Sequence, residues 1–145
     1  MKKFRKKFMA ILTALLLVVL PTELRAASVD PGYDVMPCWE YMHGITLGLN
    51  FDGTDGFADI SVTPLTGITT YLEGTLSVYR RTGGDWTLVA SASNSSSNVL
   101  FIDVEFNAVY GQTYKAEATV TAYGDNGSET DTVSNQANCP KAEDS

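Results

Sequence analysis

The sequence predicts an all-β protein, a sandwich of two antiparallel sheets with about seven strands, preceded by a signal-peptide helix. Two observations predict this class. Apolar and polar residues alternate with a period of two through most of the chain after residue 44, the pattern of strands with one buried face. Short segments rich in Gly, Asp, Asn and Ser interrupt the alternation, as turns between short strands do. A length of 145 residues favours a single domain.

The first 26 residues have the three parts of a secretory signal peptide. Five Lys and Arg side chains precede Phe8, and an apolar run of 13 residues extends from Phe8 to Leu20. Pro21 ends this run, and the small residues Ala26 and Ala27 follow. The alternative is a retained membrane anchor, but a membrane span needs about 20 apolar residues. We therefore expect cleavage near Ala26 and a secreted, extracellular product that is not an integral membrane protein.

Behind the signal peptide at 1–26 we expect an N-terminal strap at 27–42, the sandwich domain at 43–138 and a C-terminal tail at 139–145. Cleavage changes the charge of the chain, because 16 of the 17 acidic residues remain but only 4 of the 10 basic ones, a net charge of −12. Such a surface keeps a protein soluble and repels nucleic acid, so we expect no nucleic-acid partner. Cation binding is the alternative interpretation of the acidic surplus.

Six strands are expected from apolar side chains that alternate onto one inward face. In chain order, the inward-facing sets are Ile45, Leu47, Leu49 and Phe51; Ala58, Ile60 and Val62; Leu76 and Val78; Trp86, Leu88 and Ala90; Leu100, Ile102, Val104 and Phe106; and Tyr114, Ala116, Ala118, Val120 and Ala122. A seventh, more polar strand is expected over 129–136.

The breaks between these segments carry turn chemistry. Asp52–Gly56, Gly83–Asp85 and Asp125–Gly127 combine Asp or Asn with Gly and predict hairpins. The segment Ser93–Asn98 contains only Ser and Asn, and we expect it to be a polar loop.

Two segments carry a resemblance to a known class of module. Residues 76–89 resemble the third and fourth strands of fibronectin type III and immunoglobulin-like modules, and residues 111–129 resemble their sixth strand and last hairpin. Tyr114, three residues after Gly111, is similar to the tyrosine corner of these sandwiches. The mature chain also resembles small secreted single-domain proteins of Gram-positive bacteria that have no assigned activity. The resemblance implies the fold but no site residues, because a fold does not determine a function.

The only two cysteines lie near the two ends of the mature chain. Cys38 and Cys139 are 101 positions apart, and export permits a disulfide between them. The spacing fits no zinc pattern. We expect an intramolecular disulfide, and the alternatives are two free thiols or an intermolecular bridge.

The sequence offers little material for catalysis or for metal binding. His43 is the only histidine, and no nucleophile motif surrounds it, so we expect no catalytic residues, no enzyme and no cofactor. Asn50, Asp52 and Asp55 lie in one turn and are a weak candidate for calcium. Because Asp and Asn also form ordinary turns, our expectation is that no metal is bound.

Tyr79 and Tyr123 form the candidate binding face. Both fall on the outward register of strands that would be neighbours in a fibronectin-like sheet, where exposed rings stack on sugars or on protein partners. The same register places four polar residues on this face: Lys115, Glu117, Thr119 and Thr121. The alternative is ordinary cross-strand packing of the two rings.

From these features we expect a secreted, non-catalytic module that binds an extracellular glycan or protein. A structural subunit of a cell-envelope or matrix layer is the first alternative, because free sheet edges can polymerise. A small glycan-active enzyme is the second.

Overall fold

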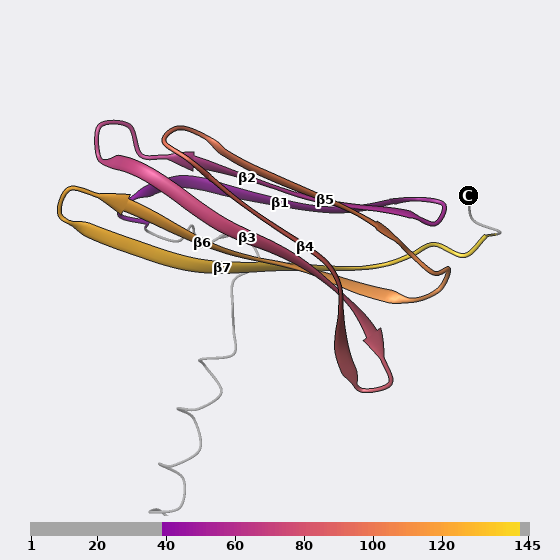
Figure 1. Cartoon of the computed structure of the whole chain (residues 1–145). Helices are drawn as coiled ribbons and strands as arrows, with labels where there is room; N and C mark the ends of the chain where they lie inside the picture. The colour runs from indigo at the N-terminus through magenta and orange to yellow at the C-terminus, as the bar shows by residue number, and fades with distance from the viewer. Residues whose placement is uncertain (1–38, 143–145) are drawn as a thin grey trace, which may run out of the picture. The chain divides into compact units, whose positions relative to one another are not determined.

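The computed structural model describes residues 39–142, which form seven strands and no helix (Figure 1). The strands are β1 (Met42–Asp52), β2 (Asp55–Pro64), β3 (Thr69–Thr82), β4 (Asp85–Ser96), β5 (Leu100–Asn107), β6 (Thr113–Gly124) and β7 (Gly127–Asn138). The expected signal peptide at 1–26 and most of the expected strap lie outside the described residues. Within 39–142 no helix has the length and apolar character that a bilayer crossing needs.

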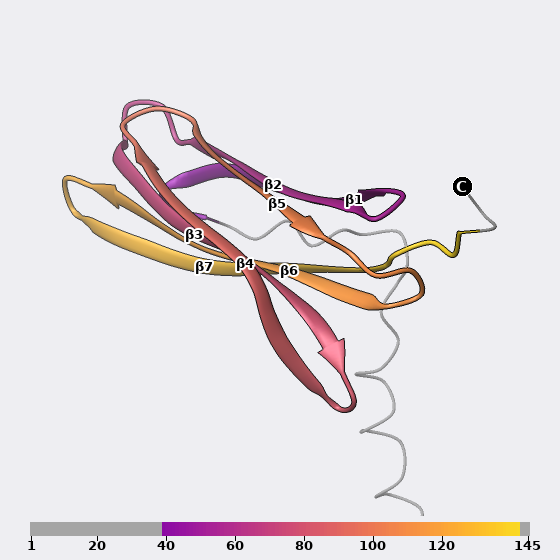
Figure 2. The ribbon, with the colours of Figure 1, turned by 45° about the vertical axis from the view of Figure 1, so that its right-hand side comes forward.

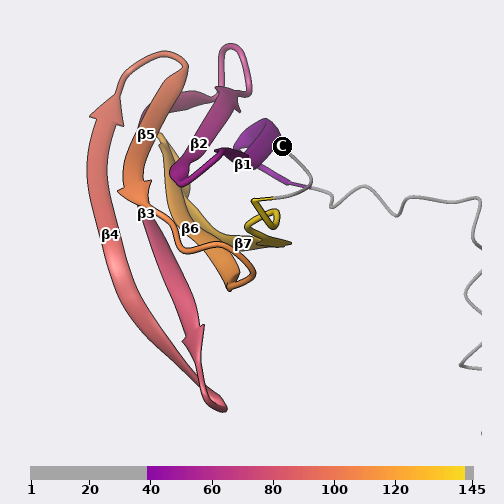
Figure 3. The same ribbon diagram turned by 90° about the vertical axis from the view of Figure 1, so that its right-hand side faces the viewer.

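The strands form two sheets that lie over each other as layers (Figure 2). One sheet has the order β1-β2-β5 and the other the order β4-β3-β6-β7, and all pairs of neighbours are antiparallel. This confirms the predicted all-β sandwich of the fibronectin type III and immunoglobulin-like class. β3 and β6 are neighbours, as the resemblance implies. The hairpin of β3 and β4 extends past the other strands at one end (Figure 3).

The core lies between the two sheets and follows the predicted alternation most closely in β2, β5 and β6. In β5 every second residue is buried, from Leu100 to Phe106. In β6 the ring of Tyr114 and the side chains that follow at every second position are completely buried. Strict alternation on these strands results from burial on one face only, because the other face of each sheet is in contact with solvent.

β4 departs from the predicted register at Val89. Val78 of β3 lies opposite Ala90, but the next residue, Tyr79, lies opposite Leu88. Val89 therefore has no partner on β3 and forms a β-bulge. The register shifts by one residue there, so the side chains between Val89 and the hairpin turn lie on the opposite faces from those predicted. Ala90 packs against the core as predicted. The prediction that Trp86 and Leu88 also face inward is wrong.

The expected loop at Ser93–Asn98 is also wrong in part, because β4 continues through Ser96. β3 begins at Thr69, well before the predicted core residues Leu76 and Val78, and its first half pairs with this part of β4. Leu72 in that half is completely buried. The next inward position is Gly74, where an added Cβ would lie 3.2 Å from Leu100 Cδ2 and 3.3 Å from Ile102 Cδ1.

Candidate functional site

The candidate site is the solvent side of the four-stranded sheet, which we call the outer face. On β3 and β6 it consists of the residues that alternate with the buried ones: Tyr71, Glu73, Thr75, Ser77 and Tyr79, and Lys115, Glu117, Thr119, Thr121 and Tyr123. All the residues that the sequence analysis assigned to this face are therefore brought together on it.

Tyr79 and Tyr123 lie at opposite ends of the outer face. Tyr79 is opposite Lys115, whereas Tyr123 is opposite Tyr71, eight residues away along β3. At 3.3 Å per residue this separation is about 26 Å. The two tyrosines therefore do not form one aromatic pair, and each has different neighbours.

One end of the outer face is an aromatic–cationic cluster, formed by Tyr79, Arg81, Trp86, Leu88 and Lys115. The Lys115 ammonium nitrogen lies 5.0 Å from the ring centroids of both Tyr79 and Trp86. The Arg81 guanidinium carbon lies 5.9 Å from the Trp86 centroid, within the range of a cation–π contact. Leu88 is 55% exposed beside them. The bulge at Val89 assembles this cluster, because it turns Trp86 and Leu88 toward Tyr79.

Basic residues are concentrated at this end of the domain. Residues 39–142 contain 12 acidic side chains and 4 basic ones, and three of the four are Arg80, Arg81 and Lys115. Lys115 Nζ lies 3.4 Å from Glu117 Oε2, the only ion pair among the described residues. Neither arginine has a described carboxylate within ion-pair distance, although Asp85 lies at the tip of the same hairpin. Arg81 contacts the Trp86 ring and lies on the outer face, whereas Arg80 lies on the inward register of β3, opposite Tyr114.

The middle of the outer face carries rows of paired hydroxyl groups. The hydroxyl oxygens are 2.7 Å apart in Thr75–Ser93, 3.0 Å in Ser77–Ser91, 3.0 Å in Thr119–Thr132 and 2.8 Å in Thr121–Thr130. Each pair joins two neighbouring strands. This part of the face is polar, and its charged side chains are Glu117, opposite Ser77, and Glu73, opposite Thr121.

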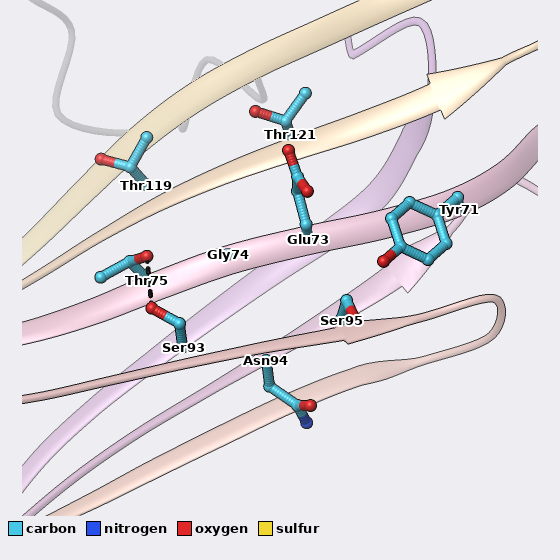
Figure 4. A pocket seen from close by; sticks show the side chains of 9 residues that line it. All are labelled: Tyr71, Glu73, Gly74, Thr75, Ser93, Asn94, Ser95, Thr119 and Thr121. Carbon is cyan, nitrogen blue, oxygen red and sulfur yellow. Dashed lines mark hydrogen bonds between the residues drawn. The ribbon is translucent and has the colours of Figure 1, made fainter.

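The other end of the outer face contains a pocket of about 550 Å³, which we call the Tyr71 pocket (Figure 4). Its lining residues are Tyr71, Glu73, Gly74, Thr75, Ser93, Asn94, Ser95, Thr119 and Thr121. The rings of Tyr71 and Tyr123 are 6.0 Å apart, and the Tyr123 hydroxyl donates a hydrogen bond to Glu73. This hydrogen bond, with the negative charge of Glu73, raises the pKa of Tyr123.

Tyr114 is a structural residue. Its ring is completely buried and lies 5.5 Å from the ring of Phe51 and 5.2 Å from that of Phe106. Because a buried hydroxyl needs a partner, the sequence predicts a hydrogen bond from the Tyr114 hydroxyl to the backbone near Gly111. In the structure the Tyr114 hydroxyl oxygen accepts a hydrogen bond of 2.8 Å from the Val109 N–H.

We expect the Tyr114→Phe variant to be less stable by about 0.5–1.5 kcal/mol, because it leaves the Val109 N–H without its partner. Partner binding should not change, because Tyr114 lies between the sheets. Urea unfolding and a binding assay on the same preparation measure both effects. Unchanged stability would mean that the hydrogen bond contributes nothing.

The predicted disulfide has no support in the structure. Cys139 is a buried free thiol whose Sγ lies 3.4 Å from the Gly53 carbonyl oxygen, and burial raises its pKa. Cys38 lies outside the described residues. Its neighbour Trp39 donates a hydrogen bond of 2.6 Å to Asp131 of β7, which precedes Cys139 by eight residues. A disulfide needs the Cα atoms of its two cysteines within about 7 Å of each other. We therefore expect the hydrogen bond between Trp39 and Asp131 to break if Cys38 and Cys139 form a disulfide. The disulfide stays a prediction, which intact mass after alkylation checks.

The weak calcium candidate gains no further ligand. Asn50, Asp52 and Asp55 are exposed at the hairpin of β1 and β2, where Asp52 and Asp55 lie opposite each other. Within residues 39–142 no three His, Cys, Asp or Glu side chains gather closely enough to hold a metal ion. His43 is exposed near the start of β1.

Comparison with known proteins assigns no family. No family model matches the chain, and no curated protein matches it. Among solved structures, the solution structure of AT1g01470 from Arabidopsis thaliana has a TM-score of 0.41 and 12% identity, over 77% of this chain and 87% of that chain. The twitchin kinase region from C. elegans has a TM-score of 0.32 and 18% identity, over 65% of this chain and 15% of that chain. Neither similarity assigns a function.

Proposed function

We propose that this protein is a secreted, non-catalytic interaction module that binds an extracellular partner, a glycan or a protein, with the outer face of its four-stranded sheet. The observation that carries the proposal is the β-bulge at Val89. If Val89 paired with Tyr79 and the pairing continued without a bulge, Trp86 and Leu88 would face inward. With it, both lie beside Tyr79, Arg81 and Lys115 at the surface.

The composition of the aromatic–cationic cluster supports a binding role. Trp, Tyr and Arg are the residues that contribute most to binding in known interfaces. An exposed leucine beside them costs solvation free energy in the isolated protein, and a partner that covers it recovers this cost. Arg81 contacts the Trp86 ring but has no carboxylate partner among the described residues, so its charge is not neutralised by an ion pair within the described domain.

Secretion is part of the proposal and rests on the N-terminal sequence. The basic start, the apolar run and the small residues near Ala26 have the order of a signal peptide. N-terminal sequencing of the exported product tests it, and a product that still begins at Met1 would contradict it.

The same bulge weakens the alternative of a polymerising envelope subunit at one sheet edge. β4 and β7 are the two edges of the four-stranded sheet, and the bulge lies on β4. A bulge interrupts the ladder of hydrogen bonds that such pairing needs, and bulges are one of the ways in which proteins protect edge strands.

Cosedimentation of the mature protein with isolated cell-envelope material tests the proposed face. We expect a Tyr79→Ala/Trp86→Ala double variant to lose at least severalfold in affinity, because aromatic contacts contribute about 0.5–1.5 kcal/mol each beyond the area they bury. The matched control is Phe101→Ala, which removes a ring that is 63% exposed on the other sheet. The proposal is wrong if the double variant binds normally, or if the control loses as much.

A further inference from the structure

We infer that the Tyr71 pocket is a subsite for a neutral sugar, and that the partner of the outer face is a polysaccharide chain that lies along β3 and β6. This inference deepens the proposed function and rests on it, because it assumes that the outer face is the binding face. It adds the chemical class of the partner and the direction in which it lies.

The side chains that line the Tyr71 pocket select this class. They comprise one aromatic ring, one carboxylate, one amide and several hydroxyl groups, and no lysine or arginine. An anionic ligand would find no counter-charge there and would be repelled by Glu73. A lipid or an apolar peptide would find no aliphatic side chain to contact. A sugar matches the lining, because it combines many hydroxyl groups with an apolar ring face.

Glu73 has the capacity to accept hydrogen bonds from sugar hydroxyls. Its carboxylate is exposed and takes part in no ion pair with the described residues. The Tyr123 hydroxyl donates to one of its oxygens, which fixes the carboxylate and leaves further acceptor positions toward the pocket. Figure 4 shows Glu73 between Thr121 of β6 and Ser95 of β4, at the centre of the lining.

The neighbouring hydroxyl groups are held in place before a ligand arrives. Thr75 and Ser93 bond each other at 2.7 Å, and Thr121 and Thr130 at 2.8 Å. Each hydroxyl has one donor and two acceptor positions, so every pair leaves acceptor positions unused. Because these side chains are already ordered, little conformational entropy is lost when a sugar binds them.

Tyr71 supplies a stacking surface at the end of the pocket. Its side chain is 40% exposed, and the Tyr123 ring packs against it with an angle of 46° between the two planes. This contact fixes the orientation of the Tyr71 ring. The apolar face of a sugar can then stack on the exposed part of the ring.

The distance between the Tyr71 pocket and the aromatic–cationic cluster determines how long the glycan must be to contact both. Tyr71 and Tyr79 share one face of β3 and are eight residues apart, which is about 26 Å. A disaccharide in the Tyr71 pocket does not reach Trp86. A longer chain that follows the strands contacts both ends and the hydroxyl rows between them, so its two contacts act together.

Titration calorimetry of the mature full-length protein tests this inference. The probes are neutral cello-, chito- and manno-oligosaccharides from the disaccharide to the octasaccharide, with polygalacturonic acid as the anionic comparison. We expect a neutral series to bind, with affinity rising at least tenfold once the chain spans both ends of the face. Tyr71→Ala should weaken short and long oligosaccharides at least tenfold, and Glu73→Gln severalfold. Trp86→Ala should weaken only the long ones.

The controls are Phe101→Ala and Glu105→Gln, which make the same kinds of change on the exposed side of the other sheet. Both should bind as the wild type does, and all variants should keep the wild-type melting temperature.

Three results would overturn the inference. The first is that no neutral oligosaccharide series binds. The second is that polygalacturonic acid binds more tightly than the neutral oligosaccharides. The third is that neutral oligosaccharides bind but their affinity is unchanged in Tyr71→Ala and Glu73→Gln. If envelope binding still depends on Trp86 in such a case and is lost after protease treatment of the envelope, the partner is a protein and the proposed function stands. If envelope binding is independent of Tyr79 and Trp86 as well, both proposals are wrong.

Discussion

The exchange variant Trp86→Thr/Thr87→Trp is expected to reduce partner binding at least tenfold while the domain stays folded, because tryptophan is among the side chains that contribute most to binding. Trp86 lies opposite Arg81 on the outward register, and Thr87 lies opposite Arg80 on the inward one. The exchange therefore moves the indole to the other side of the hairpin without changing the composition of the chain. Lys115 and Arg81 then lose their contacts with the Trp86 ring.

The matched control is Val89→Ala, which keeps the residue count and therefore the bulge. We expect this variant to bind as the wild type does. Binding is measured by cosedimentation with envelope material, and the tryptophan emission spectrum reports whether the surroundings of Trp86 have changed. Wild-type binding by the exchange variant, with an altered emission spectrum, would show that the position of Trp86 is irrelevant to the function.

The Leu72→Ala variant is expected to lose about 2–5 kcal/mol of unfolding free energy, the usual cost of removing a buried leucine side chain. Leu72 is completely buried in the first half of β3, so truncation of its side chain leaves a cavity in the core. For a domain of this size such a loss lowers the melting temperature by roughly 10 °C or more.

Leu88→Ala is the control for this experiment, because it makes the same change at a leucine that is 55% exposed. It should alter the unfolding free energy by no more than about 0.5 kcal/mol. Urea unfolding midpoints compare the two. Equal losses would contradict the register of β4 and place Leu88 in the core.

The strands that the sequence predicts best are those in which one face meets the core at every second residue. β5 is such a strand, since Leu100, Ile102, Val104 and Phe106 alternate with polar or exposed residues. The first half of β3 was not predictable in this way. One of its inward positions is Gly74, which contributes no apolar side chain, so the alternation around Leu72 is not visible.

The alternation pattern fails to predict the bulge in β4 for a different reason. Leu88, Val89 and Ala90 are all apolar, so the pattern fits a continuous strand and a bulged strand equally well. The turn of the hairpin carries the information on register. Gly83 and Gly84 form a two-residue turn, with Gly83 at a φ of +64°, and such a turn fixes the register of its strands. Counting outward from it places Trp86 opposite Arg81 and Leu88 opposite Tyr79.

The sequence therefore predicts the face but not its two ends. Alternation with core residues of β3 and β6 predicts the outward register of Tyr79 and Tyr123. Their neighbours come from other parts of the sheet. Trp86 reaches Tyr79 only through the bulge, and Tyr71 reaches Tyr123 only because β3 begins at Thr69.

The most direct test of the claim that the outer face binds the partner is chemical-shift mapping of the isotope-labelled mature protein during titration with solubilised envelope polysaccharide. We expect the largest shifts at the indole N–H of Trp86 and at the outward residues of β3 and β6, from Tyr71 and Tyr123 to Tyr79 and Lys115. Shifts concentrated around Phe57 and Phe101 on the other sheet, with these residues unchanged, would contradict the claim.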